Sequence, residues 1–249
     1  SMFDLLKICG SHQDHRLIEF LNLQLKLYSQ ENVYNTPALY GCTVLQMPQN
    51  PHGLWHLNQS MQVLSQSLEE SLRKTNAKVL YGQTVTSICF DQENQFWRVH
   101  AQTKKESFEY IAKDIVYAIP PQSLLDHLEG DSQKHKQYEK KIRTISNPSG
   151  AVVFYSAISR NNIKKTSYSH YQFKNKELGS LFLSLSQEGD GRAPLGEMTL
   201  VASLFTDTKD WFNLSKNNYL EKKKTYFNKI SLAIESKFEI SSDKWIHRE

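Results

Sequence analysis

Two pairs of histidines are the residues whose spacing first suggests chemistry. One pair lies three residues apart and the other four apart, so a helix would bring either pair onto one face as metal ligands. Neither pair has a carboxylate or thiolate at a useful spacing, and a proline argues against a helix around the second pair. We therefore predict no metal site. The residues concerned are His12 with His15, and His52 with His56 beside Pro51.

Other motifs that would carry chemistry are missing from the sequence. Gly189 and Gly191 form a Gly-x-Gly, but a third glycine is lacking, Pro194 blocks a following helix, and the context is strand to strand. The sequence has no Gly-x-Gly-x-x-Gly, Walker lysine or nucleophile elbow. Its three cysteines include no Cys-x-x-Cys pair, which argues against a disulfide framework and a structural zinc site. The catalytic residues therefore stay unknown.

Composition narrows the class of protein and its partners. Of the 249 residues, 39% are hydrophobic and 22% charged, as in a soluble globular protein. No apolar run approaches the ~20 residues that span a bilayer, and the start lacks a secretory pattern. The net charge is +4, and lysines gather at 134–141 and 222–224. We interpret these groups as solvated helix faces, with contact to an anionic membrane surface as the alternative, and expect no nucleic-acid partner. A cytoplasmic or peripherally membrane-associated protein is expected.

The N-terminal third is predicted to be helical and then irregular. Apolar residues recur at helical spacing over 3–10 and 14–28, and glycine, proline and asparagine interrupt 29–56. A loop this long is often functional, and its apolar side chains suit a lid or a cavity wall. The candidates for substrate binding are Tyr40, Leu54 and Trp55. Alternatively, 37–46 is a helix and the segment is ordinary packing.

The central part reads as an amphipathic helix followed by short strands. Its apolar residues Met61, Leu64, Leu68 and Leu72 line one face of a helix that therefore has a side to bury, and Ser60 is a suitable N-cap. Polar turns separate strands expected at 79–81, 85–90, 96–101 and 110–111, which form a β-meander. A nearly continuous apolar run at 114–119 predicts a strand covered on both faces, ending at two prolines, Pro120 and Pro121.

The C-terminal half predicts an antiparallel sheet with one face available for a ligand. Strands are expected at 151–158, 167–173, 181–185 and 198–205, after a short helix at 122–128 and an exposed helix or loop at 129–143. A long helix over 217–238 carries a broad apolar stripe, with Lys222 to Lys224 on the opposite side. Trp245 and Ile246 begin another extended segment.

The fold class expected from these elements is α+β, an antiparallel sheet packed by helices together with a β-meander. Three regions follow: a helical and irregular region at 1–58, a helix plus meander at 59–121, and a sheet with a long C-terminal helix at 122–249.

Several stretches of this sequence resemble one family of enzymes. They are 53–61, the strand pattern beginning at Val79, the run 114–121 that ends in Pro-Pro, and 192–200 with its Ala-Pro and Thr-Leu. Together they are similar to the FAD-dependent phytoene desaturase, carotenoid isomerase and retinol saturase group, which is related to flavin amine oxidases. Gln59 and Ser60 stand where that group has glycines. The resemblance extends weakly over most of the chain.

The resemblance implies a function and a cofactor. It implies the substrate-binding part of an FAD-dependent oxidoreductase that passes hydride between flavin and an apolar polyene or isoprenoid. The backbone at Thr84 and Val85 and the strand end at Ala118 and Pro120 would lie near FAD, and Trp55 beside the route to the flavin. Since the dinucleotide-binding motif is not in this chain, we expect a fragment that is inactive alone. The β-meander would then belong to an FAD-binding α/β domain.

Two alternatives to this enzyme stay open. One is a non-catalytic lipid- or isoprenoid-binding protein derived from the same family. The other is a flavin amine oxidase acting on a polar amine, although no acidic and aromatic cage is evident. Whether the chain is an enzyme is therefore uncertain.

Overall fold

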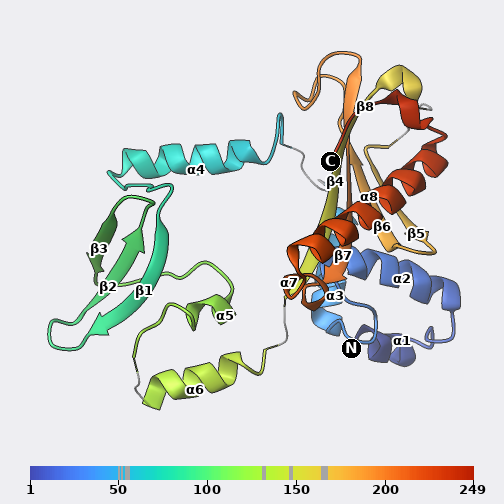
Figure 1. Cartoon of the computed structure of the whole chain (residues 1–249). Helices are drawn as coiled ribbons and strands as arrows, with labels where there is room; N and C mark the ends of the chain where they lie inside the picture. Colours follow the sequence, from blue (N-terminus) through green and yellow to red (C-terminus); the bar gives the residue numbers. More distant parts are fainter. Residues whose placement is uncertain (50, 52, 54–56, 131–132, 146–147, 164–167) are drawn as a thin grey trace. The chain divides into compact units, whose positions relative to one another are not determined.

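Two compact units make up the chain. The computed structural model describes residues 1–49, 51, 53, 57–130, 133–145, 148–163 and 168–249 (Figure 1). Unit 1 combines Ser1–Val63 with Asn147–Glu249, and unit 2 is Leu64–Ser146. Unit 2 is thus inserted into the chain of unit 1. The three regions predicted from the sequence, 1–58, 59–121 and 122–249, stay predictions.

Unit 1 is built on a five-stranded sheet in which all neighbouring strands are antiparallel. The spatial order is β5-β6-β7-β4-β8, so the chain's last strand adds to β4 at one edge. The predicted α+β class, with an antiparallel sheet packed by helices and a separate meander, is confirmed. The strands are β4 (Ser149–Ser159), β5 (His170–Asn175), β6 (Gly179–Leu185), β7 (Glu197–Asp207) and β8 (Trp245–Arg248).

One face of this sheet is covered by the long helix α8 (Lys216–Phe238), which crosses the strands in Figure 1. Alternate residues of β6 and β7 point toward it, among them Leu183 and Leu200, both fully buried. Ile230, Ile234 and Phe238 of α8 pack into the same core. Complete burial of one such side chain stabilises the fold by ~1.5–3 kcal/mol, so this layer is the main source of stability in unit 1.

The N-terminal helices form a second core, and one of them packs on the other face of the sheet. These helices are α1 (Met2–Ile8), α2 (His15–Tyr28) and α3 (Ala38–Gln46), followed by the short η1 (Met47–Gln49). In β5, Tyr171 and Phe173 pack on the α8 side. Gln172 and Lys174 therefore point to the opposite side, where Gln172 donates to the Leu23 carbonyl and Lys174 pairs with Glu19 at 2.7 Å.

Part of the irregular region expected at 29–56 is helical. Pro37 precedes the first residue of α3, where its missing N–H costs nothing. Gly41 of α3 lies so close to α1 that a Cβ there would come within 2.6 Å of Met2. The expectation of a loop is therefore wrong for 38–46. The alternative of a helix there is confirmed, with Ala38 and Leu45 packed against the N-terminal core and Tyr40 exposed.

Unit 2 contains the predicted β-meander. Its strands β1 (Thr84–Asp91), β2 (Phe96–Gln102) and β3 (Ser107–Ala112) pair in order and antiparallel. Helix α4 (Gln62–Lys74) precedes them, and Ser60 accepts a hydrogen bond from the Gln62 backbone. The helices α5 (Pro121–Leu124) and α6 (Gln133–Ile142) follow. Ile88 of β1 connects the segment around α5 to the meander. Its backbone N–H donates to the His127 carbonyl, and its carbonyl accepts from the Glu129 N–H.

Two predicted strands are wrong, and the predicted apolar face of α4 is not buried within unit 2. Residues 79–81 and 114–119 form no strand, and within the described residues neither stretch has a ladder partner. Val116 is 92% exposed for this reason. The apolar face of α4 is also exposed, with Leu68 at 59%, because no described element of unit 2 packs on it. A strand or an amphipathic helix is buried only when a neighbour exists to cover it.

Candidate functional site

A short turn of chain between β7 and α8 gathers aromatic side chains on the edge of unit 1. Asp207 accepts a hydrogen bond from the Lys209 backbone and starts α7 (Lys209–Phe212). Ser215 then caps α8 by accepting from the Asn218 backbone. The reversal places the ring of Trp211 5.8 Å from the ring of Tyr219 and 5.3 Å from that of Tyr226.

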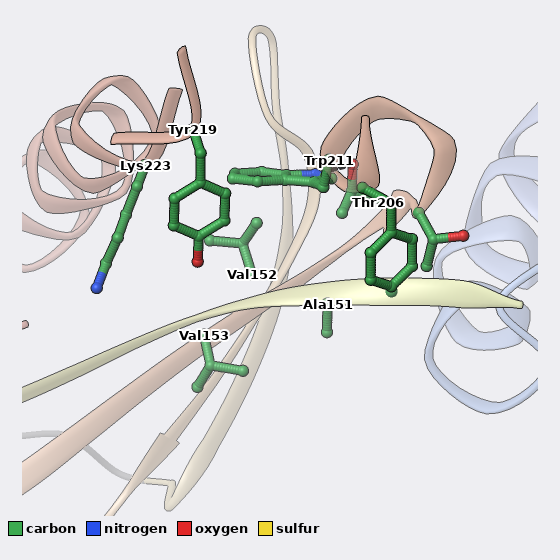
Figure 2. Close-up of a pocket in the computed structure, with 10 residues that line it drawn as sticks. Ala151, Val152, Val153, Thr206, Trp211, Tyr219 and Lys223 are labelled. Carbon is green, nitrogen blue, oxygen red and sulfur yellow. Dashed lines mark hydrogen bonds between the residues drawn. The ribbon is translucent and has the colours of Figure 1, made fainter. Parts of the chain in front are cut away.

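A cavity lies between this turn and the first half of β4. Its volume is about 360 Å³, within the range of small-molecule sites. Figure 2 shows Val152 rising from the strand toward Tyr219, with Trp211 beside them. We call this cavity the aromatic pocket; it is lined by Gly150, Ala151, Val152, Val153, Thr206, Thr208, Trp211, Phe212, Tyr219 and Lys223.

The indole of Trp211 is held in place by its polar atom and by a cation. Its Nε1 donates to Oγ1 of Thr206 at 3.2 Å, which satisfies the only polar group of the ring. Nζ of Lys222 lies 4.9 Å from the ring centroid and donates to the Asp210 carbonyl at 2.7 Å. Trp211 therefore offers a bound molecule only apolar surface.

The other end of the pocket is polar. In Figure 2 the side chains of Tyr219 and Lys223 run side by side, and the hydroxyl and the amine point the same way, past Val152. The two residues are four apart on α8, which places them on one helix face. The prediction that all of Lys222 to Lys224 lie opposite the apolar stripe is therefore wrong for Lys223, which shares the face of Tyr219 and lines the pocket.

Further cavities lie on the opposite face of the sheet: one of about 390 Å³ between α2 and β5, and two larger ones. One, of about 780 Å³, runs between α2 and the strands β5 and β6, where the rings of His170 and Phe182 stack 5.7 Å apart. The other, of about 450 Å³, is lined by Tyr155, Val201 and His247 among others. Both are edged by more polar side chains than the aromatic pocket, including Gln24, Gln172, Gln187, Gln59 and Arg192.

The structure describes one of the three predicted substrate-binding residues. Tyr40 lies on α3 and is 46% exposed, and its hydroxyl donates to the Tyr28 carbonyl at 3.1 Å. Leu54 and Trp55 lie outside the described residues. This hydrogen bond connects α3 to the end of α2. The predicted role of Tyr40 in ligand binding stays a prediction.

The predicted FAD-binding residues all lie in unit 2. Thr84 and Val85 begin β1, while Ala118 and Pro120 belong to the extended stretch before α5. Thr84, Ala118 and Pro120 are exposed, and among the hydrogen bonds of the described residues none joins β1 to Ala118 or Pro120. The role of these four residues and FAD binding by this chain therefore stay predictions.

The histidine pairs give no metal centre in the part of the chain that the structure describes. His12 stacks edge-on against Phe3 at 6.4 Å, and His15 opens α2. His52 and His56 lie outside the described residues. Within 1–49 and the other described ranges, no group of three or more His, Cys, Asp or Glu side chains could hold an ion. The same ranges contain no helix with the length and apolarity to cross a bilayer.

The chain is distantly similar in structure to a known protein. No model of a protein family matches it, and no curated protein does. Among solved structures, RAB GDI from Plasmodium falciparum aligns with a TM-score of 0.45 and 12% identity, covering 84% of this chain and 44% of that chain. The chain therefore spans less than half the length of that structure.

These comparisons correct the function expected from the sequence. The prediction of a fragment of an FAD-dependent oxidoreductase acting on a polyene is wrong. No family model and no curated protein supports an oxidoreductase, and the solved structure reported above carries the name RAB GDI.

Proposed function

We propose that unit 1 is a non-catalytic binding module for an apolar ligand of the acyl or isoprenoid kind, held in the aromatic pocket. The observation that carries the proposal is the pocket itself: a cavity of about 360 Å³ walled by Trp211 and Phe212 over the valines of β4. Pockets of this size with aromatic walls and few polar groups are what small apolar ligands occupy.

The side chains of the pocket favour binding over catalysis. Its lining, all of it within the described residues, contains no histidine, cysteine or carboxylate. The hydroxyls of Thr206 and Thr208 are both engaged, the first accepting from Trp211 and the second donating to the Pro148 carbonyl at 2.6 Å. A nucleophile paired with a general base, which covalent catalysis requires, is therefore lacking in this lining.

Burial of an apolar chain against these walls supplies the affinity. Transfer of apolar surface out of water yields roughly 25 cal/mol per Å², and Phe212, 78% exposed, has much of its surface free for contact. Because apolar ligands partition into bilayers, the proposal includes peripheral contact of the protein with a membrane surface.

Titration of the purified protein with farnesol, followed by tryptophan fluorescence and by calorimetry, tests the proposal. We expect saturable binding with a change in emission that Trp211→Phe abolishes and Trp97→Phe, in the meander of unit 2, leaves intact. Phe212→Ala, at an exposed position, should weaken binding without affecting folding. Binding that is absent from the wild-type protein, or equal in all three variants, would contradict the proposal.

A further inference from the structure

The aromatic pocket has two chemically different ends. Trp211 and the threonine Thr206 to which it is bonded stand at one end. At the other end, the hydroxyl of Tyr219 and the ammonium of Lys223 point the same way past the apolar side chain of Val152 (Figure 2). A molecule that fills the pocket along this direction meets apolar surface first and a cation with a hydrogen-bond donor last.

The two polar groups at that end have no partner in the part of the chain that the structure describes. The other polar groups around the pocket are engaged, since the Trp211 indole bonds Thr206, Thr208 bonds Pro148, and Lys222 bonds the Asp210 carbonyl. For Lys223, by contrast, the described residues provide no ion pair, and for the Tyr219 hydroxyl they provide no hydrogen bond. These are the groups that remain for a ligand.

Among the described residues, acidic side chains of β7 and α8 form no ion pair with Lys223. Asp207 pairs with Lys209 at 3.0 Å, and the hydrogen bond from Lys209 lowers the pKa of Asp207, so this carboxylate stays charged and paired. Glu221 is two residues before Lys223 on α8, a spacing at which helix side chains do not face each other. No carboxylate is among the residues that line the pocket, all of which are described.

We propose that the ligand of the aromatic pocket is an amphiphile with an anionic head, a phosphate or a carboxylate, which Lys223 and Tyr219 bind while its chain lies against Trp211 and Val152. This inference rests on the proposed function and adds the class of the ligand. A hydrogen bond from an ammonium to an anionic oxygen is about twice as strong as one between neutral groups, so Lys223 selects for charge. Tyr219 adds a donor to the same head.

Three decyl compounds that differ only in the head test this inference: decyl phosphate, decanol and decyltrimethylammonium, each below its micelle concentration. Inorganic phosphate alone is the fourth titrant. We expect decyl phosphate to bind at least about tenfold more tightly than decanol, since a hydrogen bond to a charged group contributes more than ~1.4 kcal/mol. The cationic compound should bind most weakly, and inorganic phosphate far more weakly than decyl phosphate.

Variants of α8 assign the preference to Lys223. Lys223→Gln should bring the affinity for decyl phosphate down to that for decanol, and Tyr219→Phe should lower it a few-fold. Lys224→Gln removes the same charge from the next position, turned away by about 100°, and should retain the wild-type ratio. All three positions are exposed, so folding is not at stake.

Each outcome separates this inference from the proposal on which it rests. Equal affinity for decyl phosphate and decanol would overturn the inference that the ligand has an anionic head. It would not contradict the proposed binding of an apolar ligand. Binding of none of the decyl compounds would overturn both. Inorganic phosphate binding as tightly as decyl phosphate would show a site for the free anion and overturn the amphiphile.

Discussion

Trp211 donates a hydrogen bond from its indole Nε1 to Oγ1 of Thr206 at 3.2 Å, and this contact ties the wall of the aromatic pocket to the sheet. Thr206 lies in β7 directly opposite Gly150 of β4, which lines the same pocket. The position of the indole and the shape of the pocket are therefore set by the same pair of strands.

Replacing Thr206 by valine tests this link, because the change keeps the shape of the side chain and removes the acceptor. We expect the free energy of unfolding to fall by about 1 kcal/mol and the affinity for farnesol to fall a few-fold, as the indole loses its fixed orientation. Urea unfolding and fluorescence titration measure the two effects. Thr225→Val, on the exposed side of α8, is the control and should leave ligand affinity unchanged. Unaltered affinity in Thr206→Val would mean that the hydrogen bond does not orient the indole.

The layer between α8 and the sheet should dominate the stability of unit 1. Ile234 is fully buried in that layer, while Leu232, two residues away on α8, is 63% exposed. Ile234→Ala is expected to lower the free energy of unfolding by roughly 2–5 kcal/mol, since it leaves a cavity. Leu232→Ala should change it by less than about 1 kcal/mol. Denaturant unfolding of both variants is the measurement, and similar losses in the two would contradict the packing described.

Two glycines of the β6–β7 connection share a backbone conformation but differ in surroundings. Gly189 and Gly191 have φ values of 80° and 78°, and a Cβ at Gly191 would come within 3.2 Å of Gln59, whereas at Gly189 it would meet nothing within 4 Å. Both alanine variants should lose about 1–2 kcal/mol of stability through backbone strain. Gly191→Ala should lose more stability than Gly189→Ala. Adding Gln59→Gly to the Gly191→Ala variant should remove this extra loss. Thermal unfolding compares the variants; equal losses would mean that the contact with Gln59 is easily displaced.

The same connection should make stability depend on pH in the acid range. Burial raises the pKa of Asp190, but hydrogen bonds from the Arg192 guanidinium and from the backbones of Arg192 and Gln187 outweigh it and lower the pKa to about 2. A carboxyl with a depressed pKa in the folded state stabilises the protein above its unfolded value of about 4 and loses that contribution as the pH falls toward 2. The Asp190→Asn variant lacks this stabilising contribution at every pH.

We therefore expect the wild-type protein and Asp190→Asn to differ in melting temperature at pH 6 and to converge between pH 4 and pH 2. Melting curves recorded across this range provide the test. A difference that stays constant down to pH 2 would show that Asp190 keeps an ordinary pKa. Other carboxyls, such as Asp4, titrate in both proteins and cancel in the comparison.

The sequence was a good guide wherever an element finds its partner within its own unit. The apolar spacing over 217–238 predicted α8, and alternation predicted the strands of the sheet and the meander, because the neighbours that cover them belong to the same unit. Asp114 to Ile119 and the leucines of α4 carry equally strong patterns, yet they remain uncovered among the described residues. An apolar pattern predicts that a face is suited to burial, but it does not show whether a neighbouring element covers that face.

The candidate site was missed because its residues carry no motif. Trp211 stands in the link between a strand and a helix, and Tyr219 lies in a helix whose apolar stripe is explained by core packing alone. One signal was present in the sequence: Tyr219 and Lys223 are four residues apart, a spacing that places an aromatic ring and a cation on one helix face. That a strand would bring Val152 beneath them depends on long-range pairing, which spacing does not reveal.

The insertion of unit 2 into unit 1 sets the order in which the molecule can be assembled on the ribosome. Helix α2 packs on β5 through Gln172 and Lys174, residues synthesised long after the helix itself. All of unit 2 emerges in between, and its meander consists of contacts between near neighbours in the chain, which form quickly. The nascent chain therefore completes unit 2 before the sheet on which helix α2 packs has been synthesised.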